Sequence, residues 1–444
     1  MQTITYLFSV CVLVLAVAGC RHDDPYFCEG APHNNCLAID AGPRRCTGDG
    51  DCTAAGAGVC DTQSMTCVQC TAAEHTACGG TSPVCGADDS CRGCSSHAEC
   101  PDSNVCLPDG SCAATGDVAY VVPAPDGTDN PTCSMASPCT KLVKALATGR
   151  SYVKLHGTTD EAVTIKDRNV TVLADPGATL TRTSNGNILV IDGTSDVKIY
   201  DLAINGASGS GAGVSLLNGG TQSLTLTRVA MSGNNGTGGA ILATGGTLTV
   251  SEGTISGNTG VGISASGTLT VSRSTISANN AGGVQMNADN VVTLTNNFVH
   301  HNGNDVSSSF GAFSLRPAPG SKVQFNTIID NKANMGTASA GGVFCDVTGF
   351  VAEGNLVFAI RGATTTVQTF GNCTYGNSFV MGTAAADNTP QFVHPNTPPF
   401  DYHLTSSTPT TIRDAGGVCT GLDFDGDTRP VGAACDLGAD EVRP

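Results

Sequence analysis

The centre of the chain repeats one alternation of apolar and polar residues. Four segments begin at Leu224, Leu248, Leu269 and Val292, and each reaches an asparagine ten residues later. Apolar residues alternate with Thr or Ser at the start of each segment, which is the pattern of a β-strand with one buried face. The sequence therefore predicts a strand followed by a turn in every repeat.

Aligned repeats give columns of like residues spaced 21 to 30 residues apart. The first apolar column is Ile199, Leu226, Val250, Val271, Leu294, Val323 and Val351, and five residues later follow Ile204, Met231, Ile255, Ile276, Val299, Ile328 and Leu356. Another strand contributes Val214, Ile241, Ile263, Val284, Phe313 and Val343, and the asparagine column is Asn234, Asn258, Asn279, Asn302 and Asn331. One coil cannot bury its own apolar side, so repeats of this length stack on each other. The asparagines then predict an amide ladder at a turn, because Asn tolerates the left-handed conformation.

These columns resemble the right-handed parallel β-helix family, the pectate-lyase-like superfold. A leucine-rich repeat would need a helix and a Leu-x-x-Leu-x-Leu frame in each unit, which the sequence lacks. The resemblance covers residues 118–385, and 121–147 is similar to the family's N-terminal segment, with a short helix expected at 141–148. It implies that Cys133 and Cys139 pair there. Residues 386–444 resemble the C-terminal region of secreted β-helix proteins, through segments such as Asp436-Leu-Gly-Ala-Asp-Glu441.

A cysteine-rich region precedes this body. Removing Cys11 in the leader and Cys20 as a lipid acceptor leaves 20 of the 22 cysteines, an even number that favours disulfides in an exported chain. Twelve of them repeat with a period of 24: Cys46, Cys52, Cys60, Cys67; Cys70, Cys78, Cys85, Cys91; Cys94, Cys100, Cys106, Cys112. We expect the first to pair with the third and the second with the fourth, although four cysteines allow three pairings. The C-x-x-C pairs at 67/70 and 91/94 leave a zinc or redox alternative, but both straddle a repeat boundary.

The N-terminus predicts export. The apolar run Leu7–Ala18 has the length of a signal peptide, and Val17-Ala18-Gly19-Cys20 resembles the lipobox of bacterial lipoproteins. We expect a signal at 1–19, lipidation of Cys20, a linker at 20–45, cysteine-rich repeats at 46–115, the β-helix at 116–385 and a C-terminal cap region at 386–444. Arg21 instead of Asp favours the outer membrane, with membrane contact through the lipid only. The alternative is an ordinary cleaved signal and a secreted protein.

Composition agrees with an all-β chain and limits its partners. Gly is frequent at 56 residues, and only 13% of residues are charged, which suits short strands and turns better than helices. The net charge of −17 argues against a nucleic-acid partner, because phosphate backbones require a basic surface. The predicted fold class is all-β, a right-handed parallel β-helix solenoid preceded by a small disulfide-rich repeat region.

Two groups of residues are candidates for chemistry. Asp201, Arg228, Glu252 and Arg273 follow the first column on consecutive coils and alternate in sign. They fit either a lyase-like site, in which a basic residue abstracts a proton, or a surface salt-bridge ladder. The run of Asp423, Asp425 and Asp427 is typical of a calcium loop, the alternative being a hydrogen-bonded turn at Gly426. Calcium is the one cofactor that the sequence suggests.

Other positions carry structural expectations. His300 and His301 could hold a metal with Asp305, but adjacent strand residues are expected to point to opposite faces. Cys419 and Cys435 bracket the Asp423 loop and are expected to pair. Cys345 and Cys373 are 28 residues apart, like Val323 and Val351, which predicts one column on adjacent coils and a disulfide with Cα atoms about 5 Å apart.

Three functions remain open at this point. The first is a surface module for adhesion or polymer binding, with a polysaccharide or another surface protein as partner and no evident catalysis. The second is a polysaccharide lyase or glycoside hydrolase, and the third is a structural spacer in the envelope. Residues 201–297 contain three acids and no aromatic residue, which makes that stretch poor for sugar binding and favours the non-catalytic functions.

Overall fold

The computed structural model describes residues 45–53, 56–74, 77–217, 221–334, 340–358, 361–362, 368–381 and 389–443. The predicted signal, Cys20 and most of the linker lie outside the described residues. The chain divides into two compact units, Met1–Ala77 with Ala87–Ser90, and Cys78–Gly86 with Cys91–Pro444. The last cysteine-rich repeat therefore belongs to the same unit as the β-helix.

Disulfides hold the cysteine-rich repeats, because their strands are too short to bury a core. The hairpin of β1 (Val59–Asp61) and β2 (Thr66–Val68) carries Cys46–Cys60 and Cys52–Cys67. The pair β3 (Val84–Cys85) and β4 (Cys91–Arg92) adjoins Cys78–Cys91. The last repeat contains Cys94–Cys106 and Cys100–Cys112. These pairs follow the expected order, first with third and second with fourth. Short 3-10 helices occur at η1 (Asp49–Asp51), η3 (His97–Glu99) and η4 (Thr115–Asp117).

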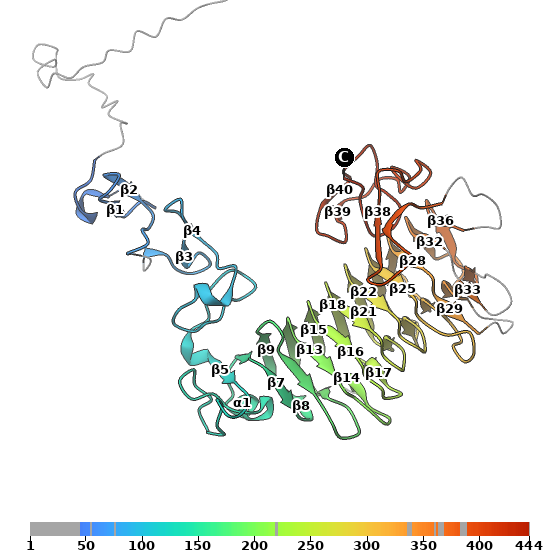
Figure 1. Cartoon of the computed structure of the whole chain (residues 1–444), viewed down its shortest axis with the longest axis horizontal. Helices are drawn as coiled ribbons and strands as arrows, with labels where there is room; N and C mark the ends of the chain where they lie inside the picture. The colour runs from blue at the N-terminus through green and yellow to red at the C-terminus, as the bar shows by residue number, and fades with distance from the viewer. Residues whose placement is uncertain are drawn as a thin grey trace, which may run out of the picture. The chain divides into compact units, whose positions relative to one another are not determined.

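Three parallel sheets form the β-helix, and each complete coil contributes one strand to each sheet (Figure 1). Sheet 1 contains β5 (Val118–Val121), β6 (Tyr152–Leu155), β9 (Asn169–Ala174), β12 (Asp196–Tyr200), β15 (Ser223–Thr227), β18 (Thr247–Ser251), β21 (Thr268–Ser272), β24 (Val292–Thr295), β27 (Lys322–Gln324), β31 (Val351–Glu353) and β35 (Thr374–Gly376). Sheet 2 contains β7 (Thr158–Asp160), β10 (Thr179–Thr181), β13 (Ala203–Asn205), β16 (Ala230–Ser232), β19 (Thr254–Ser256), β22 (Thr275–Ser277), β25 (Phe298–His300), β28 (Thr327–Ile329), β32 (Leu356–Phe358) and β36 (Phe379–Val380). Sheet 3 contains β8 (Val163–Lys166), β11 (Leu189–Asp192), β14 (Ala212–Leu216), β17 (Gly239–Ala243), β20 (Ile263–Ala265), β23 (Val284–Met286), β26 (Phe313–Leu315), β30 (Val343–Cys345) and β34 (Thr369–Phe370).

Smaller elements flank the three sheets. The helix α1 (Leu142–Ala147) lies within the predicted range and packs on β5 and β6. The short strands β29 (Lys332–Ala333) and β33 (Arg361–Gly362) pair beside the coils. The C-terminal cap contains β37 (Phe392–His394), β38 (Asp401–Leu404), β39 (Gly421–Leu422) and β40 (Thr428–Arg429). In the described residues, no helix is long and apolar enough to span a membrane.

The apolar columns stack inside the coils, with two corrections. The register places Leu226, Val250 and Val271 on adjacent strands of sheet 1, as the sequence predicted. Gln324 aligns with Glu353, so the neighbour of Val323 is Ala352, and Val351 is 45% exposed. Val357 instead of Leu356 continues the sheet 2 column, since Ile328 aligns with it. The sequence alignment was wrong by one residue in this coil. It assumed a spacing of 28 residues where the register gives 29, and an apolar residue stood next to the correct one at both positions.

The asparagine column forms the predicted ladder. Asn258 Nδ2 donates to Asn279 Oδ1 at 2.8 Å, and Asn279 Nδ2 donates to Asn302 Oδ1 at 2.9 Å, all three fully buried. The left-handed residue of the turn is the preceding one, such as Ala278 with φ of 52°, and not the asparagine. A second ladder at the corner between sheets 1 and 2 joins Asn297, Asn326 and Asn355, which the sequence columns had not included.

Candidate functional site: a cleft under the C-terminal cap

The C-terminal cap folds back onto the corner between sheets 1 and 2. Ala439 N–H donates to Thr327 Oγ1 at 2.9 Å, and Asn296 Nδ2 donates to the Leu422 carbonyl at 2.8 Å. Leu356, which faces out of the coil, is buried beneath cap residues that include Leu404 and Leu437. The cap is thus held on the side of the last coils by both apolar and polar contacts.

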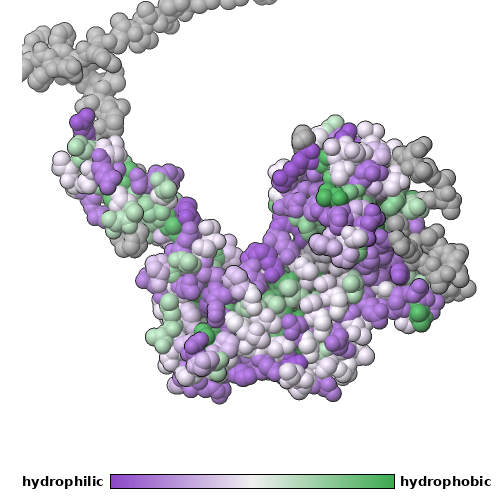
Figure 2. All heavy atoms as spheres, in the orientation of Figure 1, coloured by the Kyte–Doolittle hydropathy of each residue, from purple (hydrophilic) through white to green (hydrophobic). Residues whose placement is uncertain are grey.

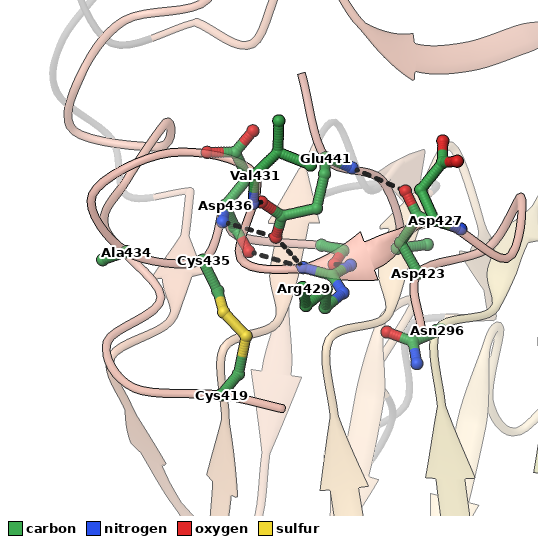
Figure 3. Close-up of polar contacts among 12 residues, drawn as sticks. Asn296, Cys419, Asp423, Asp427, Arg429, Val431, Ala434, Cys435, Asp436 and Glu441 are labelled. Carbon is green, nitrogen blue, oxygen red and sulfur yellow. Dashed lines mark hydrogen bonds and ion pairs between the residues drawn. A yellow bond between two sulfur atoms is a disulfide. The ribbon is translucent and has the colours of Figure 1, made fainter. Parts of the chain in front are cut away.

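A buried ion pair organises the cap (Figure 3). Arg429 Nη1 lies 2.5 Å from Glu441 Oε1, and both side chains are 1% exposed. Arg429 also donates to the carbonyls of Asp436 and Gly438, so the buried guanidinium has several acceptors. Cys419 and Cys435 form a disulfide beside this pair, with Cα atoms 6.1 Å apart.

The three aspartates of the candidate calcium loop have separate partners. Asp423 is fully buried and accepts the backbone N–H groups of Asp427 and Glu441. Asp427 binds Arg443, with Nε at 2.7 Å from Oδ2. Asp425 points toward His403 instead, 3.3 Å from its Nε2. The local structure is a turn in which Gly426 N–H donates to the Asp423 carbonyl, and it does not bring the three carboxylates together.

A cleft of about 460 Å³ lies between the cap and sheet 2. This volume falls within the range of small-ligand sites, about 300–1,000 Å³. Aromatic rings dominate the surface of this cap cleft, and its lining residues are Thr275, Phe298, His300, His394, Pro399, Phe400, Asp401, Tyr402, His403 and Phe424. Sequence reasoning missed it because the rings come from β25 and from cap residues about 100 positions later, while residues 201–297 lack aromatic rings.

The rings of the cleft pack on one another. Phe400 stacks on His301 with ring centroids 4.2 Å apart, and Phe424 lies 4.4 Å from Phe298. Tyr402 is almost fully buried and stands parallel to Phe400 at 6.1 Å. Because Phe400 and Phe424 are only partly buried, they keep exposed ring surface toward the cleft. Exposed aromatic faces with polar groups between them suit sugar rings, which have apolar faces and hydroxyl edges.

His300 and His301 converge, although strand alternation predicted opposite faces. His301 has a φ of 55°, so it belongs to the turn after β25 and the alternation ends at His300. The two Nδ1 atoms lie 3.1 Å apart. Burial and then the neighbouring His301 lower the pKa of His300 to about 3, so its ring is neutral at physiological pH. In the described part of the chain, neither histidine forms a metal-ligand cluster with Asp305.

His403 is the polar centre of the cleft. Its Nδ1 lies 2.6 Å from Asp401 Oδ1, and its ring packs edge-on against Phe298 at 5.0 Å. Burial lowers the pKa of His403, but the hydrogen bond to Asp401 and the charges of Asp440 and Asp425 outweigh burial and raise it above its ordinary value. Burial raises the pKa of Asp440 to about 7.

The alternating charges on sheet 1 form a ladder of ion pairs. Asp201, Arg228, Glu252 and Arg273 all have positive φ at the corner between sheets 1 and 2. Arg228 binds Asp201 through two hydrogen bonds of 2.6 and 2.9 Å, and Arg273 contacts Glu252. Each arginine is therefore held by a carboxylate on a neighbouring coil.

A second cleft of about 880 Å³ separates this ladder from the last cysteine-rich repeat. His97, Tyr200, Asp201 and Arg228 are among its lining residues. Tyr120 Oη donates to the Ser103 carbonyl at 2.6 Å, which fastens the repeat to the first coils. The ring of His97 accepts the Cys106 N–H at Nδ1. His97 thus has a structural role in the repeat. The second cleft also contains fewer aromatic residues than the cap cleft.

Two other expected disulfides also form. Cys133 and Cys139 are bonded, with Cα atoms 4.8 Å apart, beneath α1. Cys345 and Cys373 are bonded at a Cα separation of 5.6 Å. The expectation of a shared column was wrong, because Phe344 aligns with Phe370 and the coil spacing is 26 residues. Cys373 lies beyond the end of β34 and reaches Cys345 from the following turn.

A match to a known protein family agrees with this architecture. A family model described as right handed beta helix region matches residues 155–313 and 239–389. The crystal structure of pectate lyase Pel9A is 14% identical, with a TM-score of 0.49, over 73% of this chain and 96% of that one. No curated protein matches the chain.

Proposed function

Because the chain belongs to the right-handed β-helix family, whose matches span residues 155–389 of 444, we propose that it is an extracellular module that binds a polysaccharide in the cap cleft. One observation carries this proposal. The partly buried rings of Phe400 and Phe424 line a cleft of about 460 Å³ together with His300, His394 and Asp401.

The charges around the cleft favour an uncharged glycan. Asp401, Asp425 and Asp440 lie together on the cap side, and the whole chain carries a net charge of −17. A polyuronate would be repelled by this field, whereas carboxylates accept hydrogen bonds from sugar hydroxyls. Figure 2 shows that the visible surface of the coils and cap is mostly hydrophilic or neutral in hydropathy, as expected for a protein that faces water.

A polysaccharide microarray tests binding, and an incubation assay separates binding from cleavage. We expect retention on neutral polysaccharides and weaker retention on polygalacturonate and alginate. A lyase would release unsaturated products from the acidic polymers, with a rise in ultraviolet absorbance. Absence of binding to every polysaccharide would contradict the proposal and favour a spacer or a protein-binding module.

We also propose that Cys20 anchors the protein in the cell envelope, on the strength of the Val17-Ala18-Gly19-Cys20 sequence. Several acyl chains on one cysteine give a firm anchor, at about 0.8 kcal/mol for each buried CH₂. A fatty-acid analogue should label the wild type and not C20A. Equal labelling of both would leave the secreted alternative.

A further inference from the structure

We propose that His403, Asp425 and Asp440 form a binding site for a divalent transition-metal ion, with Asp401 orienting the histidine. The inference goes beyond glycan binding and does not depend on it. One ligand atom of each of the three side chains lies within 4.8 Å of the others. They come from β38, from the turn between β39 and β40, and from the C-terminal segment, so the fold assembles them from distant positions.

The histidine is held as metal-binding histidines are. Asp401 Oδ1 accepts the Nδ1–H of His403 at 2.6 Å, which leaves Nε2 to face Asp425 and Asp440. A carboxylate that accepts a hydrogen bond from one ring nitrogen fixes the tautomer and makes the other ring nitrogen a better metal ligand. Nε2 is buried and has no hydrogen-bond partner in the described structure, although Asp425 Oδ2 is 3.3 Å away. A buried nitrogen lone pair that faces two carboxylates is unfavourable unless a cation or a proton lies between them.

The buried carboxylate gives a second, independent indication. Asp440 is 5% exposed, and its Oδ2 accepts the backbone N–H of Leu404 at 2.7 Å. Among the described residues no group donates a hydrogen bond to Oδ1, which leaves this oxygen for a cation. A carboxylate so buried requires a partner, and the nearest positive candidate is the ring of His403.

The third ligand can adjust to the ion. Asp425 is exposed and lies in a turn, so its side chain can move toward Nε2 without disturbing the core. Tetrahedral Zn²⁺ bonds of about 2.0–2.2 Å place ligand atoms about 3.4 Å apart. His403 Nε2 and Asp425 Oδ2 already have this spacing at 3.3 Å, and the distances to Asp440, which are below 4.8 Å, require only a small further approach. Water would complete the coordination on the side of the cap cleft, because His403 and Asp401 line it.

The ligand set favours a transition metal over calcium. One imidazole and two carboxylates suit Zn²⁺ or Mn²⁺, whereas Ca²⁺ takes six to eight oxygen ligands. The competing explanation is a proton on Nε2, which would pair His403 with Asp425 and require no metal. Direct titration with metal separates the two explanations.

The test is isothermal titration of the purified, oxidised chain with Zn²⁺, Mn²⁺ and Ca²⁺, without any glycan, after removal of metals by a chelator. We expect one Zn²⁺ or Mn²⁺ per chain, about tenfold or more weaker binding by H403Q and D425N, and unchanged binding by D427N. Asp427 is the matched control, since it lies two residues from Asp425 but binds Arg443. Because Asp425 is exposed, D425N is expected to fold even if H403Q does not.

Three results would overturn the proposal. They are no saturable binding of Zn²⁺ or Mn²⁺, equal affinity in the wild type and D425N, or an equal loss in D427N. Tighter binding of Ca²⁺ than of Mn²⁺ would overturn the assignment to a transition metal. Glycan binding without metal binding would refute this site and leave the proposed function intact.

Discussion

At the scale of single residues, the aromatic surroundings of His300 decide its charge. The side chain is 8% exposed, its ring centroid lies 4.9 Å from that of Tyr402, and Nδ1 faces His301. A cation at this place would lose its hydration and meet a second histidine. His300 therefore contributes the face of a neutral imidazole ring to the cap cleft instead of a positive charge.

The lowered pKa of His300 predicts a defined loss of stability in acid. With a folded pKa of about 3 against about 6.5 when unfolded, the unfolded chain binds more protons between these values. The stabilisation is complete above pH 6.5 and decreases as pH falls toward 3, by about 2–4 kcal/mol at pH 4. Urea unfolding at pH 7 and pH 4 should show a smaller acid-induced loss in H300Q than in the wild type. The exposed cleft residue His394 is the control, and equal losses in H300Q, H394Q and the wild type would contradict the assignment.

At the scale of elements, buried asparagines make each turn depend on its neighbours. Asn279 donates to the carbonyl of Ile255 and to Asn302, and accepts from Asn258. Because each side chain bonds to a coil on either side, the ladder couples successive turns, and one substitution leaves polar groups unpaired on both sides.

Replacement of one ladder residue should therefore cost more than a surface change of the same kind. We expect N279A to lower the free energy of unfolding by about 2–4 kcal/mol, since two or more buried hydrogen bonds are lost. N280A, at the exposed neighbouring position, should lower it by less than about 0.5 kcal/mol. Urea unfolding measures both variants, and similar effects would show that the ladder is not a stabilising element.

The coil columns were predictable from sequence, whereas the cleft was not. Apolar residues at fixed intervals place Val250 and Val271 on adjacent strands, because neighbouring coils are nearly equal in length. The predicted register was wrong by one residue at Val351 and Leu356. Leu356 faces out of the coil but is buried by the cap, so an apolar residue no longer marks the interior of the coil there. To predict the cleft, one would have to know how residues 389–443 fold back onto β25. The repeat pattern of the coils contains no information on that path.

At the scale of the whole β-helix, the cap and a disulfide protect its C-terminal coils. β34, β35 and β36 have no following strand in their sheets among the described residues. Cys345–Cys373 joins β30 to the turn after β34, and the cap covers the outer side of sheet 2. The coils that lack a stacking neighbour are thus held by one covalent bond and by apolar contacts along their side.

Removal of this disulfide should loosen the last coils and leave the central ones intact. Closing a loop of 28 residues stabilises by about 3–4 kcal/mol in the chain-entropy model. Hydrogen exchange of C345S/C373S should show faster exchange in 343–358 and 368–381, with β15 to β21 unchanged. Unchanged protection in the last coils would mean that the cap alone holds them.

The central claim is that the aromatic cap cleft binds a glycan, and the most direct test is a glycan titration of a variant that lacks one of its partly exposed rings. The measurement is the affinity of the wild type, F400A and F344A for the polysaccharide best retained on the microarray. Phe344 is the control, a partly buried aromatic residue on sheet 3 outside the cleft. We predict that F400A binds about tenfold or more weakly, a loss of about 1.4 kcal/mol, and that F344A binds like the wild type. Equal affinity of F400A and the wild type, or a loss confined to F344A, would contradict the account.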